Sequence, residues 1–463
     1  MRYAPRTTIW FALAALLGCQ GCPTDPPGDD DDSTSESAVA FEVELTLSEH
    51  IPTVGKVHFT VDRAGAEQAY VEFGPDTDYG TLAPATGDAA AGFDATLLGM
   101  KPTSDYHYRS AVVIDGETHT SEDAVLTTGL ADPDMPPVTV ELLDPDRAAG
   151  GFFVFSLIGN PAWSVIVDAD GDPVWWYVSM DESYLVSRAL LARDLESMLY
   201  LGTYSGNPED SNTQRFVVRV SIDGSEVVST QVIGAHHALT ELPDGTLAVI
   251  RGERKDCDVG EKVGAQIIEL DGAGDESLIW SAWDHFECVA AEAEVGGWTH
   301  GNALDYAPDE DAYYLGMRNF HTIVKVDRST GDLLWVMGGP ESDFVDGDGG
   351  TAFYVHQHQF DVLDGSILVF DNGSEDEMVS RAVEYSFDES AMEVDPIWSH
   401  STDPPLFVYS LGDANRLPSG NTLITWTPAG QMDEVTPDGD LVWRANTPLG
   451  AGIGYTTWLE SLY

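Results

Sequence analysis

The stretch from His236 to Ile250 reads HHALTELPDGTLAVI, and it contains the turn that decides the fold. Its Leu-Pro-Asp-Gly step lies between two short apolar segments, and related turns recur at 363–366 (LDGS) and 417–421 (LPSGN). Asp-Gly and Ser-Gly steps between apolar, β-branched segments are typical of β-hairpins. The sequence therefore predicts one kind of hairpin that is used repeatedly.

A second turn motif alternates with the first one along the chain. It occurs at Asp170-Gly171, Asp223-Gly224, Asp271 to Asp275, Thr330 to Asp332, Asp388 to Ser390 and Asp438-Gly439. Two turns in each period of about 50 residues imply four strands per unit, which is typical of the blades of a β-propeller. Six such units fit between residues 146 and 463, where no helical periodicity competes. We expect the indoles that recur in phase with these turns to pack between blades; they are Trp175, Trp280, Trp335, Trp398 and Trp443.

The segment 40–130 has a different pattern, in which apolar residues alternate with polar ones. The series VELTL that begins at Val43 is one example, and a period of two is typical of strands with one buried face. The stretch 97–109 (LLGMKPTSDYHYR) resembles the corner of a fibronectin type III domain, where a tyrosine hydroxyl ties back to the preceding turn. The predicted fold class is all-β, with a fibronectin-III-like β-sandwich at 40–130, a linker at 131–145 and a six-bladed β-propeller at 146–463.

The first residues indicate export. Two arginines precede an apolar run from Ile9 to Leu17, which is too short to cross a bilayer and is typical of a secretory signal. The run ends in Leu-Leu-Gly-Cys, which resembles a bacterial lipobox, so we expect a lipoprotein signal peptide at 1–18 and lipidation of Cys19. Residues 19–39 then form an acidic, flexible tether. This predicts a lipid-anchored protein of the bacterial cell envelope, in the periplasm or on the outer membrane. Ordinary signal cleavage beside an incidental cysteine is the alternative.

The charge balance excludes several partners. The 463 residues include 21 Lys and Arg against 79 Asp and Glu, which gives a net charge of −58. Nucleic-acid binding relies on clustered basic residues, so DNA and RNA are not expected partners, and membrane attachment would depend on the N-terminal lipid. The sequence leaves the oligomeric state open, a homodimer included. Beyond the anchor only Cys257 and Cys288 remain; in an exported protein they either form a disulfide or stay free thiols.

Three histidines occupy similar places in successive units. His237 and His358 each lie five residues before the leucine of the first turn motif, at Leu242 and Leu363. His300 lies in nearly the same place in the unit between them. Because the innermost strands of a propeller start at the same height beside its axis, we expect three imidazoles to meet in one channel mouth. A single histidine in a strand is more often structural, but three in register favour a functional site.

Several phrases, taken in order, resemble those of the bacterial arylsulfotransferase (aryl-sulfate sulfotransferase) family. They are Trp298-Thr299-His300-Gly301-Asn302-Ala303, Arg318, Asp327 to Trp335 (DRSTGDLLW), Gln357-His358, Phe370 to Gly373 (FDNG), Ser380 to Tyr385 (SRAVEY) and Arg416 to Leu423 (RLPSGNTL). The resemblance covers most of residues 150–460. It implies an exported six-bladed propeller behind an N-terminal β-sandwich. It also implies transfer of a sulfo group from a phenolic sulfate donor to a phenolic acceptor without phosphoadenosine phosphosulfate, and no cofactor is expected.

The resemblance further implies roles for individual residues. His358 matches the sulfo-accepting histidine, His300 the histidine of the Trp-x-His-x-Asn phrase, and Arg318 the sulfate-binding arginine. His237 matches the family's His-His phrase. Where many family members follow the arginine with His-Gln, this chain has Asn319-Phe320-His321. Substrate binding is expected of Asn302, His236 and Gln357.

The residue types suit this chemistry on their own. Sulfo transfer resembles phosphoryl transfer, with a loose in-line transition state that depends on positioning and cationic hydrogen bonds. Arg318 is permanently charged and can bind two oxygens at once. Asn302 can donate an amide N–H without adding a charge. A neutral imidazole at His358 can attack sulfur while His300 or His237 moves the proton, and clustered cations should keep at least one imidazole neutral.

Two other functions fit parts of the pattern. Three imidazoles could bind zinc or another transition ion for hydrolysis, although Arg318 would oppose a nearby dication. A propeller that binds other surfaces without turnover is the third reading. The acidic loop at 343–350 lacks the full oxygen-ligand spacing of a calcium site, so no metal is assigned to the chain. No Walker loop, GxSxG elbow or HExxH motif occurs, which excludes the commonest NTPase, hydrolase and zincin classes.

Overall fold

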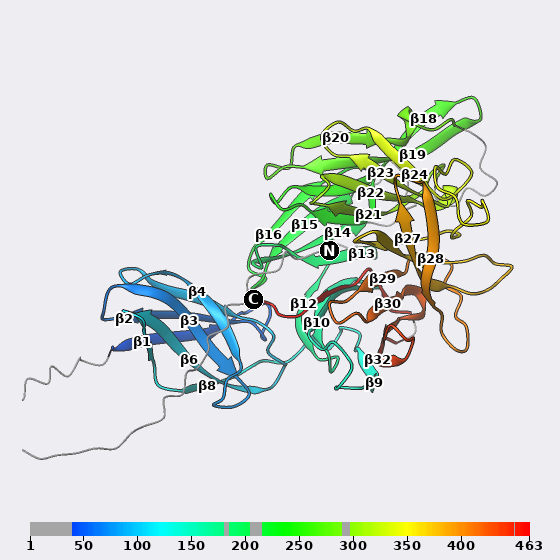
Figure 1. Cartoon of the computed structure of the whole chain (residues 1–463). Coiled ribbons are helices and arrows are strands. Elements are labelled where there is room, and N and C mark those ends of the chain that lie inside the picture. The colour runs from blue at the N-terminus through cyan, green and yellow to red at the C-terminus, as the bar shows by residue number, and fades with distance from the viewer. Residues whose placement is uncertain (1–38, 180–184, 204–214, 289–296, 449) are drawn as a thin grey trace, which may run out of the picture.

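The computed structural model of the chain describes residues 39–179, 185–203, 215–288, 297–448 and 450–463. Within these ranges it consists of strands joined by turns and loops, together with the single-turn helices η1 (Ala282–Asp284), η2 (Arg318–Phe320) and η3 (Thr427–Ala429). Figure 1 shows two bodies, a small N-terminal β-domain and a larger ring of sheets. None of the helices in these ranges has the length and apolar character that crossing a membrane requires.

The N-terminal domain is built from β1 (Phe41–Leu47), β2 (Gly55–Val61), β3 (Ala66–Gly74), β4 (Thr81–Asp88), β5 (Gly92–Leu97), β6 (Asp105–Ile114), β7 (Glu117–Thr120) and β8 (Ala124–Thr127). The strands pair in the order β1-β2-β5-β4-β3-β6-β7, and β8 pairs with β6. Alternating residues such as Val57, Phe59 and Val71 turn inward to one core. The hydroxyl of Tyr106 accepts the backbone N–H of Lys101 at 2.8 Å, which ties it to the preceding turn. The likeness to fibronectin type III stays a prediction.

The larger domain consists of six antiparallel sheets, the blades of a β-propeller. Blade 1 contains β10 (Phe152–Ile158), β11 (Trp163–Asp168) and β12 (Pro173–Val178), and blade 2 contains β13 (Leu185–Leu191), β14 (Ser197–Thr203), β15 (Arg215–Ser221) and β16 (Val227–Gln231). Blade 3 contains β17 (Ala235–Glu241), β18 (Leu247–Cys257), β19 (Gly260–Leu270) and β20 (Glu276–Ser281), and blade 4 contains β21 (Gly301–Ala307), β22 (Ala312–Met317), β23 (Thr322–Asp327) and β24 (Leu333–Met337). Blade 5 contains β25 (Phe360–Leu363), β26 (Ser366–Asp371), β27 (Arg381–Asp388) and β28 (Glu393–His400), and blade 6 contains β29 (Asp413–Arg416), β30 (Thr422–Trp426), β31 (Gln431–Val435) and β32 (Leu441–Asn446). The predicted all-β fold with a six-bladed propeller is confirmed.

Tryptophans on β12, β24, β28 and β32 join neighbouring blades. The indole N–H of Trp175 donates to Ile222 O in blade 2, and that of Trp443 donates to Ala169 O in blade 1. The acceptors lie in the outer turns, where glycines such as Gly171 (φ 84°) adopt the left-handed conformation that suits a residue without a side chain. Equivalent bonds run from Trp335 to Glu389 and from Trp398 to Pro437. These four indoles therefore lie between blades, as the sequence predicts.

Strands from both ends of the propeller sequence close the ring. β9 (Thr139–Leu143) pairs with β32 and becomes the outermost strand of blade 6. β33 (Gly452–Ile453) and β34 (Thr457–Leu459) pair with β10 of blade 1. The propeller thus begins at Thr139, and the predicted boundary at 146, with a linker at 131–145, is wrong. The partner of β9 lies at the far end of the propeller sequence, so no local pattern could place it.

Hydrogen bonds between blades hold the strands near the axis in place. Ser156 Oγ donates to Val186 O, and Ser187 Oγ donates to His237 O at 2.5 Å. Further bonds of this kind join Asn302 Nδ2 to Gln357 O (2.6 Å), Gln359 N to Gly412 O (3.3 Å) and Asn415 Nδ2 to Thr456 O (3.2 Å). They link blade 1 to 2, 2 to 3, 4 to 5, 5 to 6 and 6 to 1, so the inner strands share a common height.

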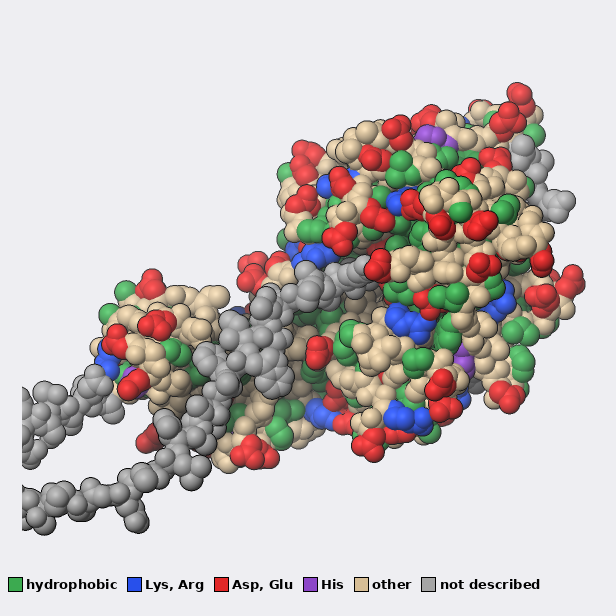
Figure 2. Space-filling model, in the orientation of Figure 1, with side chains coloured by type: hydrophobic (Ala, Val, Ile, Leu, Met, Phe, Trp, Pro, Cys, Tyr) green, Lys and Arg blue, Asp and Glu red, His purple; other side chains and the backbone are tan. Residues whose placement is uncertain are grey.

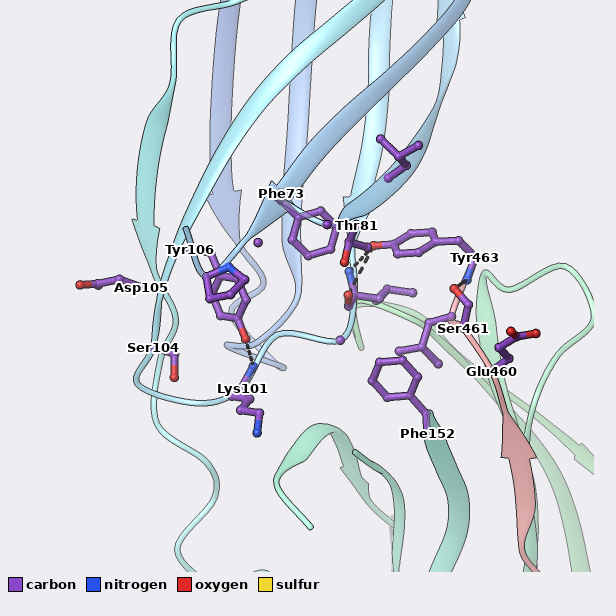
Figure 3. A pocket seen from close by; sticks show the side chains of 17 residues that line it. Phe73, Thr81, Lys101, Ser104, Asp105, Tyr106, Phe152, Glu460, Ser461 and Tyr463 are labelled. Carbon is purple, nitrogen blue, oxygen red and sulfur yellow. Dashed lines mark hydrogen bonds between the residues drawn. The ribbon is translucent and has the colours of Figure 1, made fainter. Parts of the chain in front are cut away.

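The two domains contact each other directly. The ammonium of Lys101 lies 2.6 to 2.9 Å from three carboxylates in the outer turn of blade 1, at residues 168–172. The hydroxyl of Tyr463 accepts the backbone N–H of Leu98 at 2.6 Å. Between the domains lies a cavity of about 770 Å³, shown in Figure 3, whose walls include Phe73, Tyr106 and Phe152. The N-terminal domain is therefore docked by charge and by aromatic contacts.

Cys257 and Cys288 are joined by a disulfide, which is one of the two states that the sequence leaves open. The predicted signal peptide, the lipidation site Cys19 and nearly all of the predicted tether lie outside the described residues. Acidic side chains are spread over the visible face of both domains in Figure 2, in line with the net charge.

Trp443 tests how the ring is closed. Its ring is fully buried and stacks on that of Phe153 in blade 1, with 4.4 Å between centroids. We expect Trp443→Ala to lower the free energy of unfolding by about 3–5 kcal/mol, because the stack is lost and a cavity forms. Trp443→Phe, which chiefly removes the hydrogen bond to Ala169, should cost about 1–2 kcal/mol. Urea unfolding measures both. Trp398→Ala, at a partly exposed indole, should cost less, and equal losses for the two alanine variants would contradict this view of the closure.

Candidate active site

Irregular strand pairing at the axis redirects the histidines. The pairing of β17 with β18 is interrupted around His237, and that of β21 with β22 is interrupted just after His300, at Asn302. Such bulges re-aim side chains and are common beside active sites. His237 (φ 59°) and His300 (φ 51°) adopt the left-handed backbone conformation, which is uncommon for a residue other than glycine. Strain of this kind clusters at functional sites, because the surrounding structure has to maintain it.

The structure brings the three imidazoles together. One ring nitrogen from each of His237, His300 and His358 lies within 4.8 Å of the others. The ring centroid of His237 lies 5.1 Å from that of His300 and 6.3 Å from that of His358, and the last two are 6.5 Å apart. His358 is 1% exposed and His300 is 8% exposed, whereas His237 is partly exposed. We call these three residues the histidine cluster; it is nearly closed to solvent, and His237 is its most accessible member.

Asn372 determines which nitrogen of His358 carries the hydrogen. The amide N–H₂ of Asn372 donates to the backbone oxygens of Val408 (2.7 Å) and Leu411 (2.9 Å). The amide oxygen therefore faces Nδ1 of His358, 2.6 Å away, and accepts the hydrogen on that nitrogen. A neutral imidazole with its hydrogen on Nδ1 has a lone pair on Nε2. His358 thus has its lone pair on Nε2.

Burial keeps two imidazoles of the cluster, those of His237 and His358, neutral. Burial lowers the pKa of His358 to about 3 despite the opposing bond to Asn372, and the charges of His300 and Arg318 lower it further. Burial also lowers the pKa of His237 well below its ordinary value, with added repulsion from the neighbouring histidines and Arg318. A low-dielectric environment and nearby like charge both disfavour imidazolium. His358 and His237 are therefore uncharged at neutral pH.

Arg318 supplies the permanent charge of the site. It follows β22 directly and begins η2, where its backbone N–H donates to His300 O at 2.9 Å. Its Nη1 donates to Asn319 Oδ1 at 3.1 Å. The guanidinium is partly exposed, and its charge lowers the pKa of both His237 and His358. A fixed cation beside neutral imidazoles suits an oxyanion.

Three residues predicted to bind substrate make contacts within the protein. Gln357 is fully buried, and its amide nitrogen donates to Thr322 O at 2.7 Å. Asn302 is also fully buried and donates to Gln357 O. Nδ1 of His236 lies 2.8 Å from Nδ1 of His237. Asn302 and Gln357 thus connect blades 4 and 5, and His236 lies beside His237; substrate binding by these three residues stays a prediction.

Sequence reasoning missed two further histidines near Arg318. The backbone N–H of His356 donates to Nδ1 of His321 at 3.0 Å, and the two rings lie 4.7 Å apart. Burial is the main cause that lowers the pKa of both, that of His321 to about 4, and Arg318 adds to the effect. The role of Asn372 was missed as well. Signals were available, since His356 precedes the Gln-His phrase and Asn372 belongs to the FDNG phrase.

The fold and the site together define a propeller that gathers three histidines near an arginine at its axis. A family model described as arylsulfotransferase (ASST) matches residues 142–439, more than half of the chain. The protein belongs to the arylsulfotransferase family, and this membership supports aryl sulfotransferase activity in general terms. The comparison with curated proteins gave no match.

The solved structures to which the chain is similar are distant in sequence. A protein of unknown function from Bacteroides caccae is 13% identical, with 66% of this chain and 98% of that chain covered and a TM-score of 0.43. A streptogramin B lyase is 11% identical, with coverage of 70% and 97% and a TM-score of 0.39. Virginiamycin B lyase from Staphylococcus aureus is 12% identical, with coverage of 72% and 95% and a TM-score of 0.28. These likenesses carry no argument about function.

The protonation pattern of His358 can be measured directly. We expect ¹⁵N NMR to show a neutral ring with its hydrogen on Nδ1 at neutral pH, and protonation only as the pH falls toward the pKa of about 3. Asn372→Leu removes the acceptor, so the Nδ1–H form should lose its preference while the ring stays neutral. Asn319→Leu, whose side chain contacts Arg318 instead, is the control. A His358 that titrates near the ordinary histidine pKa of about 6.5 would contradict the assignment.

Proposed function

We propose that the protein is an aryl-sulfate sulfotransferase that works by a ping-pong mechanism through an N-sulfohistidine at His358. The donor is a phenolic sulfate ester, and the acceptor is a second phenol. The observation that carries the proposal is the bond between Asn372 Oδ1 and His358 Nδ1, because it leaves a lone pair on Nε2 beside the charge of Arg318. Family membership supports the same chemistry in general terms. The lipobox-like sequence at Cys19 further supports work in the bacterial cell envelope.

In the first half of the reaction, the lone pair on Nε2 of His358 attacks the sulfur of the donor. An N–S bond forms as the S–O bond to the phenol breaks, and the electron pair leaves with the phenolate oxygen. The transition state is loose and carries its charge on the sulfo oxygens. Arg318 neutralises this charge, a contribution worth about 10²–10³ in rate for comparable groups. The leaving oxygen takes the N–H proton of another imidazole of the cluster, His300 or His237, as that ring accepts a proton on its second nitrogen and so stays neutral.

In the second half, a phenolic acceptor takes the place of the first phenol. Its O–H gives the proton to the same imidazole, which releases one from its other nitrogen, and its oxygen attacks the sulfur of the sulfohistidine. The N–S bond breaks, and its electron pair returns to Nε2. The two halves balance without water or a cofactor, so the net reaction moves one sulfo group between two phenols.

His358→Ala should abolish transfer. With p-nitrophenyl sulfate and an excess of phenol, we expect kcat/KM for p-nitrophenol release to fall by about 10⁴-fold or more, because the covalent route is closed. Without an acceptor, the wild type should show a burst of p-nitrophenol equal to the enzyme concentration, and its intact mass should rise by one sulfo group. His119→Ala, at a partly exposed histidine of the N-terminal domain, should change neither readout. Equal release by His358→Ala would refute the role of this residue.

A metal site is the second candidate, because one nitrogen from each histidine of the cluster lies within 4.8 Å of the others. Neutral imidazoles bind zinc well. Arg318 opposes a dication here, since it is close enough to lower the pKa of two of these histidines. Metal analysis of the purified protein separates the candidates. The sulfotransferase should stay active in EDTA with little bound metal, whereas stoichiometric metal whose removal stops turnover would favour a hydrolase.

A further inference from the structure

A second polar cluster lies on the propeller axis beside the histidine cluster. In blade 2 the pairing of β13 with β14 is interrupted at Arg188, as the pairing of β17 is in blade 3. In blade 5, Gln359 directly follows His358 and donates its backbone N–H to Gly412 O. Asp413 follows that glycine and opens the innermost strand of blade 6. We call Arg188, Gln359 and Asp413 the axial triad. Gln359 directly follows His358, and Arg188 and Asp413 occupy the matching positions of blades 2 and 6.

The axial triad is buried and contains polar atoms without partners. Arg188 is 8% exposed, Gln359 is 3% exposed and Asp413 is 1% exposed. Within the described ranges, no hydrogen bond reaches Nε or Nη1 of Arg188, Oε1 of Gln359 or Oδ1 of Asp413. Buried polar groups nearly always have a partner, and unpaired charges are the most costly to bury. Three such groups at one level of the axis therefore indicate a shared role.

Arg188 and Asp413 lie on two sides of the C-terminal segment. Arg188 forms a parallel bridge with Tyr455, and the backbone N–H of Thr456 donates to Asp413 Oδ2 at 2.9 Å. The charge of Arg188 influences Asp413, although no hydrogen bond joins their side chains in the described part of the chain. The triad thus offers hydrogen-bond donors on one side and acceptors on the other. Ordered water commonly bridges buried groups of this kind and makes about three hydrogen bonds to them.

Buried polar atoms without a partner among the described residues also occur in residues next to the histidine cluster. Asn302 Oδ1 and Gln357 Oε1 are further buried acceptors that no donor reaches in the residues described. The hydroxyl of Tyr455 donates to the backbone oxygen of Asn302 at 2.9 Å. Ser187, next to Arg188 in the chain, donates to His237 O. Residues adjacent to the axial triad therefore hydrogen-bond to the backbone of His237 and of Asn302, which lies two residues after His300.

We propose that the axial triad is a hydrated proton relay, in which Asp413 stores the proton that the two phenols exchange with the histidine cluster. This inference rests on the sulfo transfer proposed above. In the first half, the departing phenolate oxygen receives a proton that passes from the Asp413 carboxyl through water and an imidazole, which leaves a carboxylate. In the second half, the acceptor phenol returns a proton to Asp413 by the same route as its oxygen bonds to sulfur. The protons balance over one cycle, and no further reactant is needed.

The surroundings of Asp413 suit this role. Burial raises the pKa of Asp413 to about 6, with Asp361 of blade 5 adding to the rise and Arg188 of blade 2 opposing it. Asn415 on its own strand stabilises the carboxylate, and Tyr455 faces it from the C-terminal segment with a pKa that burial raises. A carboxyl group that titrates near neutral pH can both hold and release a proton. The imidazoles of His237 and His358, whose lowered pKa keeps them neutral, cannot store one.

Asp413→Asn tests the relay, because it keeps the shape of the side chain and removes its titration. The readout is kcat/KM for a series of aryl sulfates whose phenols differ in pKa. We expect the variant to react with p-nitrophenyl sulfate within about threefold of the wild type, since that phenolate departs readily, yet to be slowed about 10²-fold with unsubstituted phenyl sulfate. Its pH profile should also lose the inflection near the pKa of about 6.

The matched control is Glu434→Gln, at a fully buried carboxyl group of blade 6 that accepts a hydrogen bond from Asn421 away from the axis. It should keep the wild-type dependence on the leaving group. A folded Asp413→Asn protein with that same wild-type dependence would overturn the relay and leave sulfo transfer through His358 standing. Absence of the sulfo adduct in the wild type would instead overturn the proposed function.

A second measurement decides the question if Asp413→Asn does not fold. Transfer from phenyl sulfate by the wild type is measured in mixtures of light and heavy water. A relay moves more than one proton in the slow step, so the rate should depend on deuterium content along a curve. A straight line, as expected for a single proton in flight, would overturn the relay.

Discussion

The blades stay in register because their innermost strands bond to one another around the axis. A four-stranded sheet cannot bury both faces alone, so every blade depends on its neighbours. Bonds such as that from Ser187 Oγ to His237 O set the height of each strand, and indoles such as Trp443 hold the outer turns. The histidine cluster is a consequence of this ring, because each of its members belongs to a different blade. A slip of one residue in any inner strand would turn its side chains to the opposite face.

The axis is a polar interior inside an acidic protein. An anionic donor approaches a molecule with a net charge of −58, which opposes it at long range. Salt screens exposed charges over about 8 Å under physiological conditions, so the local field at the site is set mainly by what lies within that distance. There Arg318 contributes a fixed positive charge, while burial keeps His358 and His237 uncharged. The same low-dielectric environment that disfavours imidazolium thus preserves the nucleophile and leaves the guanidinium as the dominant charge.

Much of this architecture could be predicted because it is encoded in local turns. The Asp-Gly steps gave the number of blades, and the equal spacing of His237 and His358 from their turn leucines placed them at one level. Strand β9 could not be predicted, since its pairing partner lies at the other end of the propeller sequence. The hydrogen bond from Asn302 to Gln357 O could not be predicted either, because residue type shows only which atoms can donate. The assignment of Asn372 depends on carbonyl groups of a distant loop, which only the folded chain brings together.

The left-handed backbone at His237 and His300 determines how replacements at these positions should be read. Most side chains adopt this conformation at a cost of about 1–3 kcal/mol, whereas asparagine and glycine adopt it readily. Replacement by alanine changes the backbone preference at that position and also removes the imidazole. The loss of activity or stability that it causes therefore combines two effects. Asparagine separates them, and comparison of the two replacements yields the share that belongs to the imidazole.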